Sequence, residues 1–198
     1  KRFIFLSSIG VLGINTNGRS PFSIIDHPNP VEDYAKSKLE AENVLFNLSK
    51  KTGLEVVILR IPLVYGPGVK GNLSRLFKLT NSGIPLPFSL INNQKSFIGI
   101  DNLIDLIIRC IIHPNAAGKK FLVSDGHDLS TPNLIKLIAS SMGRKARLLP
   151  LPLFLLKILG SIVGKKKEIN RLVGSLRIDN SYTKEILNWT PPVSVEEG

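Results

Sequence analysis

The segment VEDYAKSKLEAENVLFNLSKKTGLEVVILRI, residues 31–61, predicts a helix followed by a strand. Residues 31–52 have the pattern of a helix, and Glu55–Ile61 is a run of β-branched and apolar residues. A further buried strand is predicted ahead of the helix, at Lys1–Leu6. The order of strand, helix and strand favours a parallel sheet covered by helices, so the sequence predicts an α/β fold.

The rest of the chain predicts a smaller α/β lobe that begins near residue 71. Its elements are expected as helices at 72–82, 101–112, 130–142 and 181–188, and as strands at 96–100 and 119–123. Ser130 with Pro132 in the first turn is a typical helix start, and Gly143 is a typical end. The boundary between the two parts is therefore expected near residue 70.

Tyr34 and Lys38 form the most informative pair of residues. Four positions apart on a helix, they project from the same face. An ammonium beside a phenol stabilises the phenolate, and a phenol tuned in this way can exchange a proton with a sugar or alcohol hydroxyl. Ser8, at the end of the first strand, could hydrogen-bond the same substrate oxygen. The three residues predict an alcohol-to-ketone oxidoreductase.

The net charge of +11 favours an anionic partner. Between Glu55 and Asp101 the sequence has no acidic residue; the cations there are Arg60, Lys70, Arg75, Lys78 and Lys95. Such a stretch suits a nucleotide diphosphate, and no finger, homeodomain or RNP pattern indicates nucleic acid. The three histidines are isolated, which indicates no metal site. Cys110 lies in an apolar helical pattern and is expected to fill core space.

The motifs FIFLSSIGVLG, YAKSKLEAE and LRIPLVYGPGVKGN resemble those of extended short-chain dehydrogenases/reductases of the NAD-dependent epimerase/dehydratase family. Within it the chain is similar to the UDP-glucose 4-epimerase group and to 4-keto reductases of the UDP-N-acetylquinovosamine type. The resemblance implies a partial Rossmann-like sheet with a smaller substrate lobe. It also implies bound NAD, with NADP as the alternative, a UDP-sugar substrate, a homodimer and a cytoplasmic location.

The resemblance assigns residues to both parts of a site. Residues 1–70 would be the end of the NAD-binding domain, and 71–198 mainly the nucleotide-sugar lobe, with some segments returning to the Rossmann core. Tyr34, Lys38 and Ser8 are the expected catalytic residues. The cofactor would contact Ser7, Tyr34, Lys38, Ile61 and Pro62. The substrate would contact Ser8, Asn72, Leu73, Phe88, Lys95 and Arg171, with Phe88 at the uracil and the two cations at the diphosphate.

The dinucleotide-binding turn of the family would precede Lys1, together with about three βα units. On that expectation residues 1–6 lack sheet neighbours on one edge and expose backbone and apolar side chains. The run GPGVKG, residues 66–71, formally fits a dinucleotide motif. No acidic residue follows it before Asp101, and Pro67 removes a backbone donor, so we do not interpret it as one.

Two departures from the family leave the reaction open. VLG stands at 11–13 where relatives have VYG, and Leu63 stands where 4-epimerases often have asparagine. A 4-epimerase is the first interpretation, and a UDP-4-keto-sugar reductase is the second. A catalytically inactive fragment and a basic module for membranes or nucleic acid are further alternatives. The apolar segment 148–164 with the lysines after it is expected to be a helix packed on the lobe; peripheral membrane contact through 148–167, or a transmembrane span, are its alternatives.

Overall fold

The computed structural model describes residues 1–69 and 71–198, which form two compact units. The first unit consists of Lys1–Gly66, Ser96–His127 and Leu176–Gly198, and the second of Pro67–Lys95 and Asp128–Ser175. The chain thus leaves the first unit after Gly66 and returns to it twice. Lys70, which belongs to the GPGVKG run and to the acid-free stretch, lies outside the described residues.

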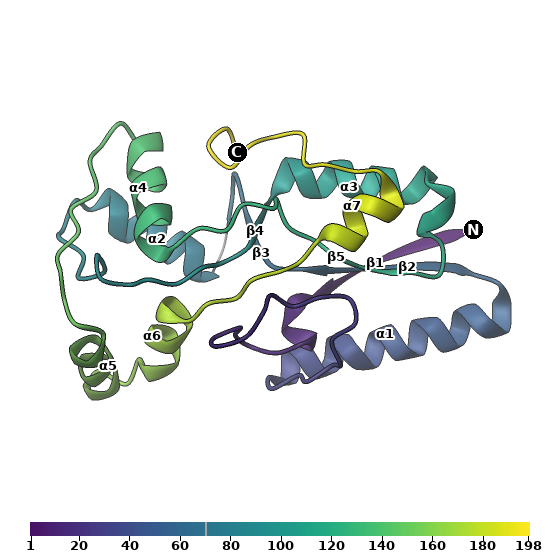
Figure 1. Cartoon of the computed structure of the whole chain (residues 1–198), viewed down its shortest axis with the longest axis horizontal. Coiled ribbons are helices and arrows are strands. Elements are labelled where there is room, and N and C mark those ends of the chain that lie inside the picture. The colour runs from purple at the N-terminus through teal and green to yellow at the C-terminus, as the bar shows by residue number, and fades with distance from the viewer. Residues whose placement is uncertain (70) are drawn as a thin grey trace. The chain divides into compact units, whose positions relative to one another are not determined.

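The first unit is a layered α/β structure. Its elements are β1 (Arg2–Ser8), a 3-10 helix (Ile9–Val11), α1 (Asp33–Thr52), β2 (Glu55–Ile61), β3 (Leu63–Tyr65), β4 (Phe97–Gly99), α3 (Ile100–Ile112), a 3-10 helix (Pro114–Ala116), β5 (Lys120–Leu122) and α7 (Ser181–Leu187). In the described chain, β1, β2 and β5 form one parallel sheet in that order, and β3 pairs with β4 in parallel. Helix α1 covers one face of the larger sheet, and α3 and α7 lie on the other (Figure 1). The predicted α/β fold is confirmed.

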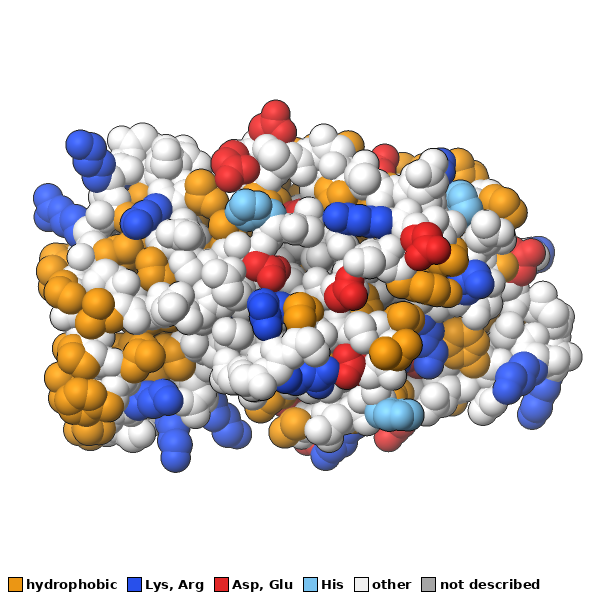
Figure 2. Space-filling view, in the orientation of Figure 1, with side chains coloured by type: hydrophobic (Ala, Val, Ile, Leu, Met, Phe, Trp, Pro, Cys, Tyr) orange, Lys and Arg blue, Asp and Glu red, His pale blue; other side chains and the backbone are white. Residues whose placement is uncertain are grey.

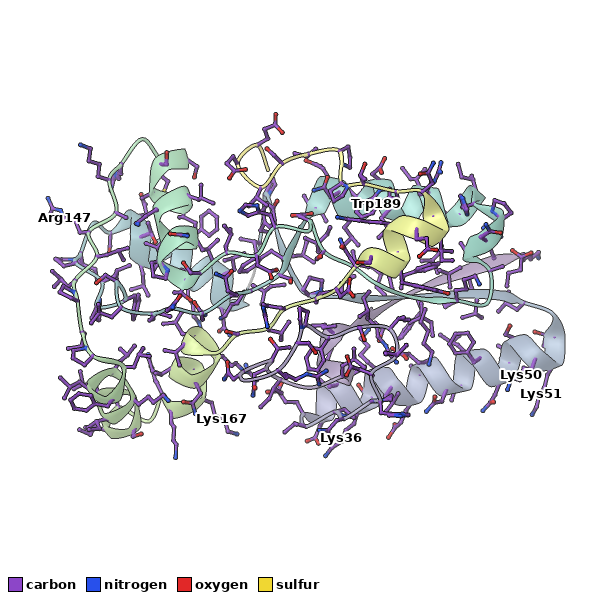
Figure 3. All side chains as sticks on the ribbon, viewed as in Figure 1. Lys36, Lys50, Lys51, Arg147, Lys167 and Trp189 are labelled. Carbon is purple, nitrogen blue, oxygen red and sulfur yellow. The ribbon has the colours of Figure 1, made fainter. Side chains whose placement is uncertain are left out.

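The core of this unit lies between the sheet and the α3/α7 layer. Val57 and Leu59 of β2 are fully buried there, and so is Cys110 of α3. Burial raises the pKa of the Cys110 thiol to about 12, so the residue fills space, as expected. Trp189 follows α7 and lies against α3 (Figure 3), where its indole donates to Asp105 Oδ2 at 2.7 Å.

The first strand differs from the buried strand that its sequence predicts. Phe3 and Leu6 of β1 are 44% and 38% exposed. The reason is position, because in the described chain β1 pairs with β2 alone and is an edge of the sheet. An edge strand leaves one row of backbone groups without a strand partner, and its side chains lack a neighbour on that side.

The second unit is mainly helical. Its elements are α2 (Gly71–Asn81), α4 (Thr131–Ser141), α5 (Leu153–Ile162) and α6 (Lys166–Val173). Ser130 caps α4 as predicted, since its side chain accepts a hydrogen bond from the Asn133 backbone N–H. The carboxamide of Asn93 joins the loop before β4 to α4 and α6 by donating to Thr131 Oγ1 and to the carbonyls of Leu172 and Gly174.

The apolar segment 148–164 forms a shorter helix than expected. Helix α5 begins at Leu153, directly after its N-cap Pro152, and within α5 only Leu156 and Gly160 are buried. Most of its side chains therefore do not pack on the lobe, in contrast to the expected packed helix. Among the described residues, no helix is both long enough and apolar enough to cross a bilayer.

A buried ion pair fastens α1 to the sheet. Glu42 is 0% exposed and Arg60 of β2 is 2% exposed, and Arg60 donates Nε and Nη2 to the two carboxylate oxygens at 3.0 and 2.7 Å. The hydroxyl of Ser7 of β1 donates to Glu42 Oε1 at 2.6 Å. Arg60 is thus neutralised inside the protein. Its inclusion among the cations available to an anionic ligand was wrong, because an arginine inside the core cannot reach one.

Removing one partner of this pair should strongly destabilise the chain. Glu42→Ala leaves the Arg60 guanidinium buried without its carboxylate, a change that typically costs about 3–5 kcal/mol. Glu40→Ala is the matched control, because Glu40 is exposed on the same helix and its loss should cost less than about 0.5 kcal/mol. Urea unfolding followed by circular dichroism measures both. Equal unfolding midpoints for the two variants would show that the pair contributes nothing.

Candidate active site

The catalytic candidates of the first unit lie at the carboxyl ends of β1 and β2 and at the start of α1. The two strands are parallel and in register, with Ser7 opposite Arg60 and Ser8 opposite Ile61. Pro62 follows β2 and is buried. Carboxyl ends of neighbouring strands in an open parallel sheet are the usual place for a ligand. The cofactor candidates Ser7, Ile61 and Pro62 therefore lie together at the carboxyl ends of β1 and β2.

One face of α1 carries Tyr34, Lys38 and Glu42 on three consecutive turns. Glu42 is fixed by the ion pair to β2, and Lys38 Nζ donates to the carbonyl of Leu6 of β1 at 3.0 Å. Both contacts hold this face against the sheet. Glu42 was not predicted from the sequence, although its spacing of four from Lys38 and the single arginine in an apolar strand were signals of a buried pair.

Tyr34 lies in the first turn of α1 and is 62% exposed. The Lys38 ammonium lies 5.7 Å from the centroid of the Tyr34 ring and 4.7 Å from that of Phe5. The predicted pair therefore exists as neighbours on one helix face, with the ammonium held between two aromatic rings and a backbone carbonyl. A substrate hydroxyl can reach the exposed phenol from solvent.

Ser8 lies close to the start of α1 but is engaged locally. Its Oγ accepts a hydrogen bond from the Gly10 backbone N–H at 3.1 Å and so caps the short helix that follows β1. A Cβ built on Gly10 would lie 3.3 Å from Ser8 Oγ and 3.5 Å from Ala35 Cβ. Glycine therefore lets the strand end and α1 approach each other. In the described residues, no hydrogen bond links Ser8 to the Tyr34 hydroxyl.

Ser7 differs from Ser8 in what its side chain can do. It is 1% exposed, and its hydroxyl is used by Glu42. The backbone of Ser7 is therefore the part that a cofactor could contact, and this contact stays a prediction.

The GPGVKG run has a structural reason for its first glycine. Gly66 has a φ of +138°, and a Cβ at this position would lie 2.5 Å from Ile100 Cγ2. Any larger residue would strain the backbone and collide with α3. This close packing explains the glycine without a dinucleotide.

The substrate candidates of the second unit are placed differently from one another. Asn72 is exposed near the start of α2, whereas Leu73 is 2% exposed and packs inside. Phe88 is 9% exposed, which is the burial of a core aromatic; its contact with a uracil stays a prediction.

Lys95 and Arg171 come together within the second unit. Lys95 Nζ donates to the backbone carbonyl of Arg171, which lies on α6, at 2.6 Å. Burial alone lowers the pKa of Lys95 to about 8, because an ammonium removed from water loses hydration. Lys95 is thus a half-buried cation that an anion would stabilise. Its role at a diphosphate stays a prediction.

A second polar network, which the sequence analysis missed, is centred on Asp125. Its carboxylate accepts hydrogen bonds from the Tyr65 hydroxyl at 2.7 Å, the Gly99 N–H at 3.0 Å and the Asn102 side chain at 2.8 Å. Burial and this carboxylate raise the pKa of the Tyr65 phenol above its usual value. Tyr65 is therefore held as a neutral hydrogen-bond donor and is not a candidate acid/base. Among the described residues, no cluster of His, Cys, Asp or Glu could hold a metal ion.

Comparisons with known proteins place this geometry in a family. Residues 1–124 match the model of the NAD dependent epimerase/dehydratase family. The chain is 47% identical to UDP-glucose 4-epimerase from Vibrio cholerae, over 100% of this chain and 61% of that protein. It is 29% identical to N-acetyl-alpha-D-glucosaminyl-diphospho-ditrans,octacis-undecaprenol 4-epimerase from Escherichia coli O157:H7, over 86% of this chain and 53% of that protein.

Solved structures share the fold. UDP-glucuronic acid 4-epimerase from Bacillus cereus matches with a TM-score of 0.78 at 22% identity, over 100% of this chain and 58% of that one. UDP-glucose 4-epimerase from Thermotoga maritima matches with a TM-score of 0.74 at 23% identity, over 100% and 60%. The chain therefore spans only about three fifths of these relatives. The family that the motifs indicated is confirmed: the chain belongs to the NAD dependent epimerase/dehydratase family.

Proposed function

We propose that the protein is an NAD-dependent UDP-sugar 4-epimerase in which Tyr34 is the acid/base. The observation that carries this proposal is the helix face that presents Tyr34 and Lys38 beside the carboxyl ends of β1 and β2. The similarity to UDP-glucose 4-epimerase from Vibrio cholerae supports the reaction. A dimer and a cytoplasmic location, which the family resemblance implies, accompany the proposal as predictions.

The residues at the carboxyl ends of β1 and β2 fit the nicotinamide end of NAD. The backbones of Ser7, Ile61 and Pro62 lie where parallel strands end, and Lys38 presents an ammonium that can donate to a ribose hydroxyl. NAD, when bound, would accept hydride from C4 of the sugar and return it to the opposite face.

The proton of the C4 hydroxyl is the part of the reaction that this chain's residues handle. Tyr34 takes it as C4 is oxidised and gives it back when C4 is reduced, while the Lys38 ammonium stabilises the phenolate. Ser8 would keep accepting from the Gly10 N–H while its own hydroxyl donates to the substrate oxygen. The contact of Gly10 with both Ser8 Oγ and Ala35 in the first turn of α1 keeps Ser8 near the Tyr34 helix, which supports this role.

Tyr34→Phe should remove most of the turnover and keep the affinity for the UDP-sugar. The substitution deletes only the proton-transferring oxygen, and such catalysis is worth about 10²–10⁴-fold. The variant is made in the natural full-length protein and assayed for 4-epimerisation with UDP-glucose. Tyr182→Phe is the control. The ring centroids of Tyr182 and Phe121 lie 5.9 Å apart, and phenylalanine keeps the ring that makes this contact. Near-normal kcat for Tyr34→Phe would contradict the assignment.

Lys95 is proposed to contact the diphosphate, with Arg171 beside it on α6. Because its pKa is about 8, Lys95 is charged below that pH and neutral above it. UDP should therefore bind best below pH 8 and lose about tenfold in affinity per pH unit above it, since binding must then take up a proton. Calorimetry between pH 7 and 9.5 measures this. Lys95→Arg should abolish the loss; if the variant keeps the same pH dependence, Lys95 does not bind the phosphates.

A hexose on a polyprenyl diphosphate is a second candidate substrate. The relative from Escherichia coli O157:H7 is named for such a substrate, and the exposed apolar side chains of α5 lie in the same unit as Lys95 and Arg171. Both substrates present a diphosphate, so the cationic residues serve either one. Parallel assays with UDP-N-acetylglucosamine and with polyprenyl-diphospho-N-acetylglucosamine decide between them by the ratio of their kcat/KM values.

A further inference from the structure

Helix α5 presents an apolar surface to solvent. Its buried residues, Leu156 and Gly160, form one narrow side, and a Cβ on Gly160 would lie 2.5 Å from Ile169 Cγ1 of α6. The opposite side carries Phe154, Ile158 and Ile162 at helical spacing, and these side chains are 63%, 51% and 75% exposed. Contiguous exposed apolar surface of this kind marks an interaction site.

Lysines border this surface, which we call the α5 face (Phe154, Ile158, Leu159, Ile162 and Val163). Lys157 lies within α5, and Lys165, Lys166 and Lys167 begin three residues after its end, the last two in α6. Figure 2 shows hydrophobic side chains gathered where α5 lies in Figure 1, with Lys and Arg side chains next to them. Lys167 extends away from the ribbon of α6 (Figure 3). From residue 129 to residue 167 the sequence contains no Asp or Glu.

The charge of the whole chain is concentrated in the unit that carries the α5 face. Residues 67–95 and 128–175 contain thirteen Lys or Arg and two acidic residues, a net charge of +11. The remaining residues contain thirteen of each sign and are neutral overall. The apolar face is therefore presented by a strongly basic unit, and the rest of the chain contributes no net charge.

We propose that the α5 face docks the protein on the surface of an anionic lipid bilayer. An apolar helix face bordered by lysines fits the boundary between acyl chains and anionic head groups, where the apolar side chains enter and the ammonium groups meet lipid phosphates. A second copy of the chain fits the α5 face less well. Pairing two copies would bring two lysine borders and two units of net charge +11 together, which is electrostatically unfavourable.

The test is co-sedimentation of the 198-residue chain with vesicles of phosphatidylcholine alone or with phosphatidylglycerol added. We expect binding to the anionic vesicles only, weakened by salt because exposed charges are screened. Ile158→Glu should weaken it about tenfold or more, because it places a carboxylate in the inserted stripe. Replacing Lys165, Lys166 and Lys167 together by Gln should weaken it about 100-fold at low salt.

Ile108→Glu is the matched control. Ile108 on α3 is 54% exposed, close to the 51% of Ile158, but it belongs to the neutral unit. Both isoleucines are exposed, so both variants should keep the parent's circular dichroism spectrum, and only Ile158→Glu should lose vesicle binding. Three results would overturn the proposal: no binding to anionic vesicles, equal loss in the two glutamate variants, or self-association of the parent that Ile158→Glu abolishes and Ile108→Glu keeps, which would indicate that copies of the chain occupy the α5 face.

Discussion

The buried contact of Glu42 with Arg60 and Ser7 determines where the site of the first unit can form. Helix α1 is long and has few buried residues, Ala35 and Glu42. Its apolar contact alone is therefore small, and a two-oxygen contact to Arg60 of β2 with a third bond from Ser7 of β1 fixes both its rotation and its position along the sheet. Buried pairs often add little stability, but they favour one arrangement over others. In this arrangement Lys38 lies one turn before Glu42 on α1, and Tyr34 lies one turn before Lys38.

The position of Lys38 illustrates how such a constraint reaches the chemistry. A free lysine side chain has many rotamers, and ordering it costs conformational entropy. The Leu6 carbonyl and the two flanking rings offset part of that cost before any ligand binds. Leu6 belongs to β1, the strand that ends in Ser8. The same strand therefore positions both the Lys38 ammonium and the candidate Ser8. Preorganisation of this kind is what a proton-transfer site requires.

The sequence predicted those elements correctly whose signals lie within a short stretch of the chain. The bounds of β2 are as predicted, and α1 starts two residues later than predicted, since β-branched runs and helix signals depend on near neighbours. The exposure of β1 could not be predicted from its apolar letters, because burial depends on which strands flank it. Arg60 was misinterpreted for a similar reason: its partner Glu42 is eighteen residues earlier and comes near only when α1 folds back on the sheet. The roles of Asn72, Leu73, Phe88, Lys95 and Arg171 stay predictions.

The separation of charge between the two units connects the proposed ligand with the proposed surface. The first unit has no net charge, so individual hydrogen bonds at the carboxyl ends of its strands would orient a ligand there. The second unit carries the whole excess of +11, so a diphosphate bound at Lys95, as proposed, would meet a net positive field. The same field acts on any anionic surface approached by α5. An Asp or Glu side chain in the second unit would weaken its attraction both for a diphosphate and for an anionic surface. This gives a physical reason for the absence of acidic side chains from a stretch of 39 residues, 129–167.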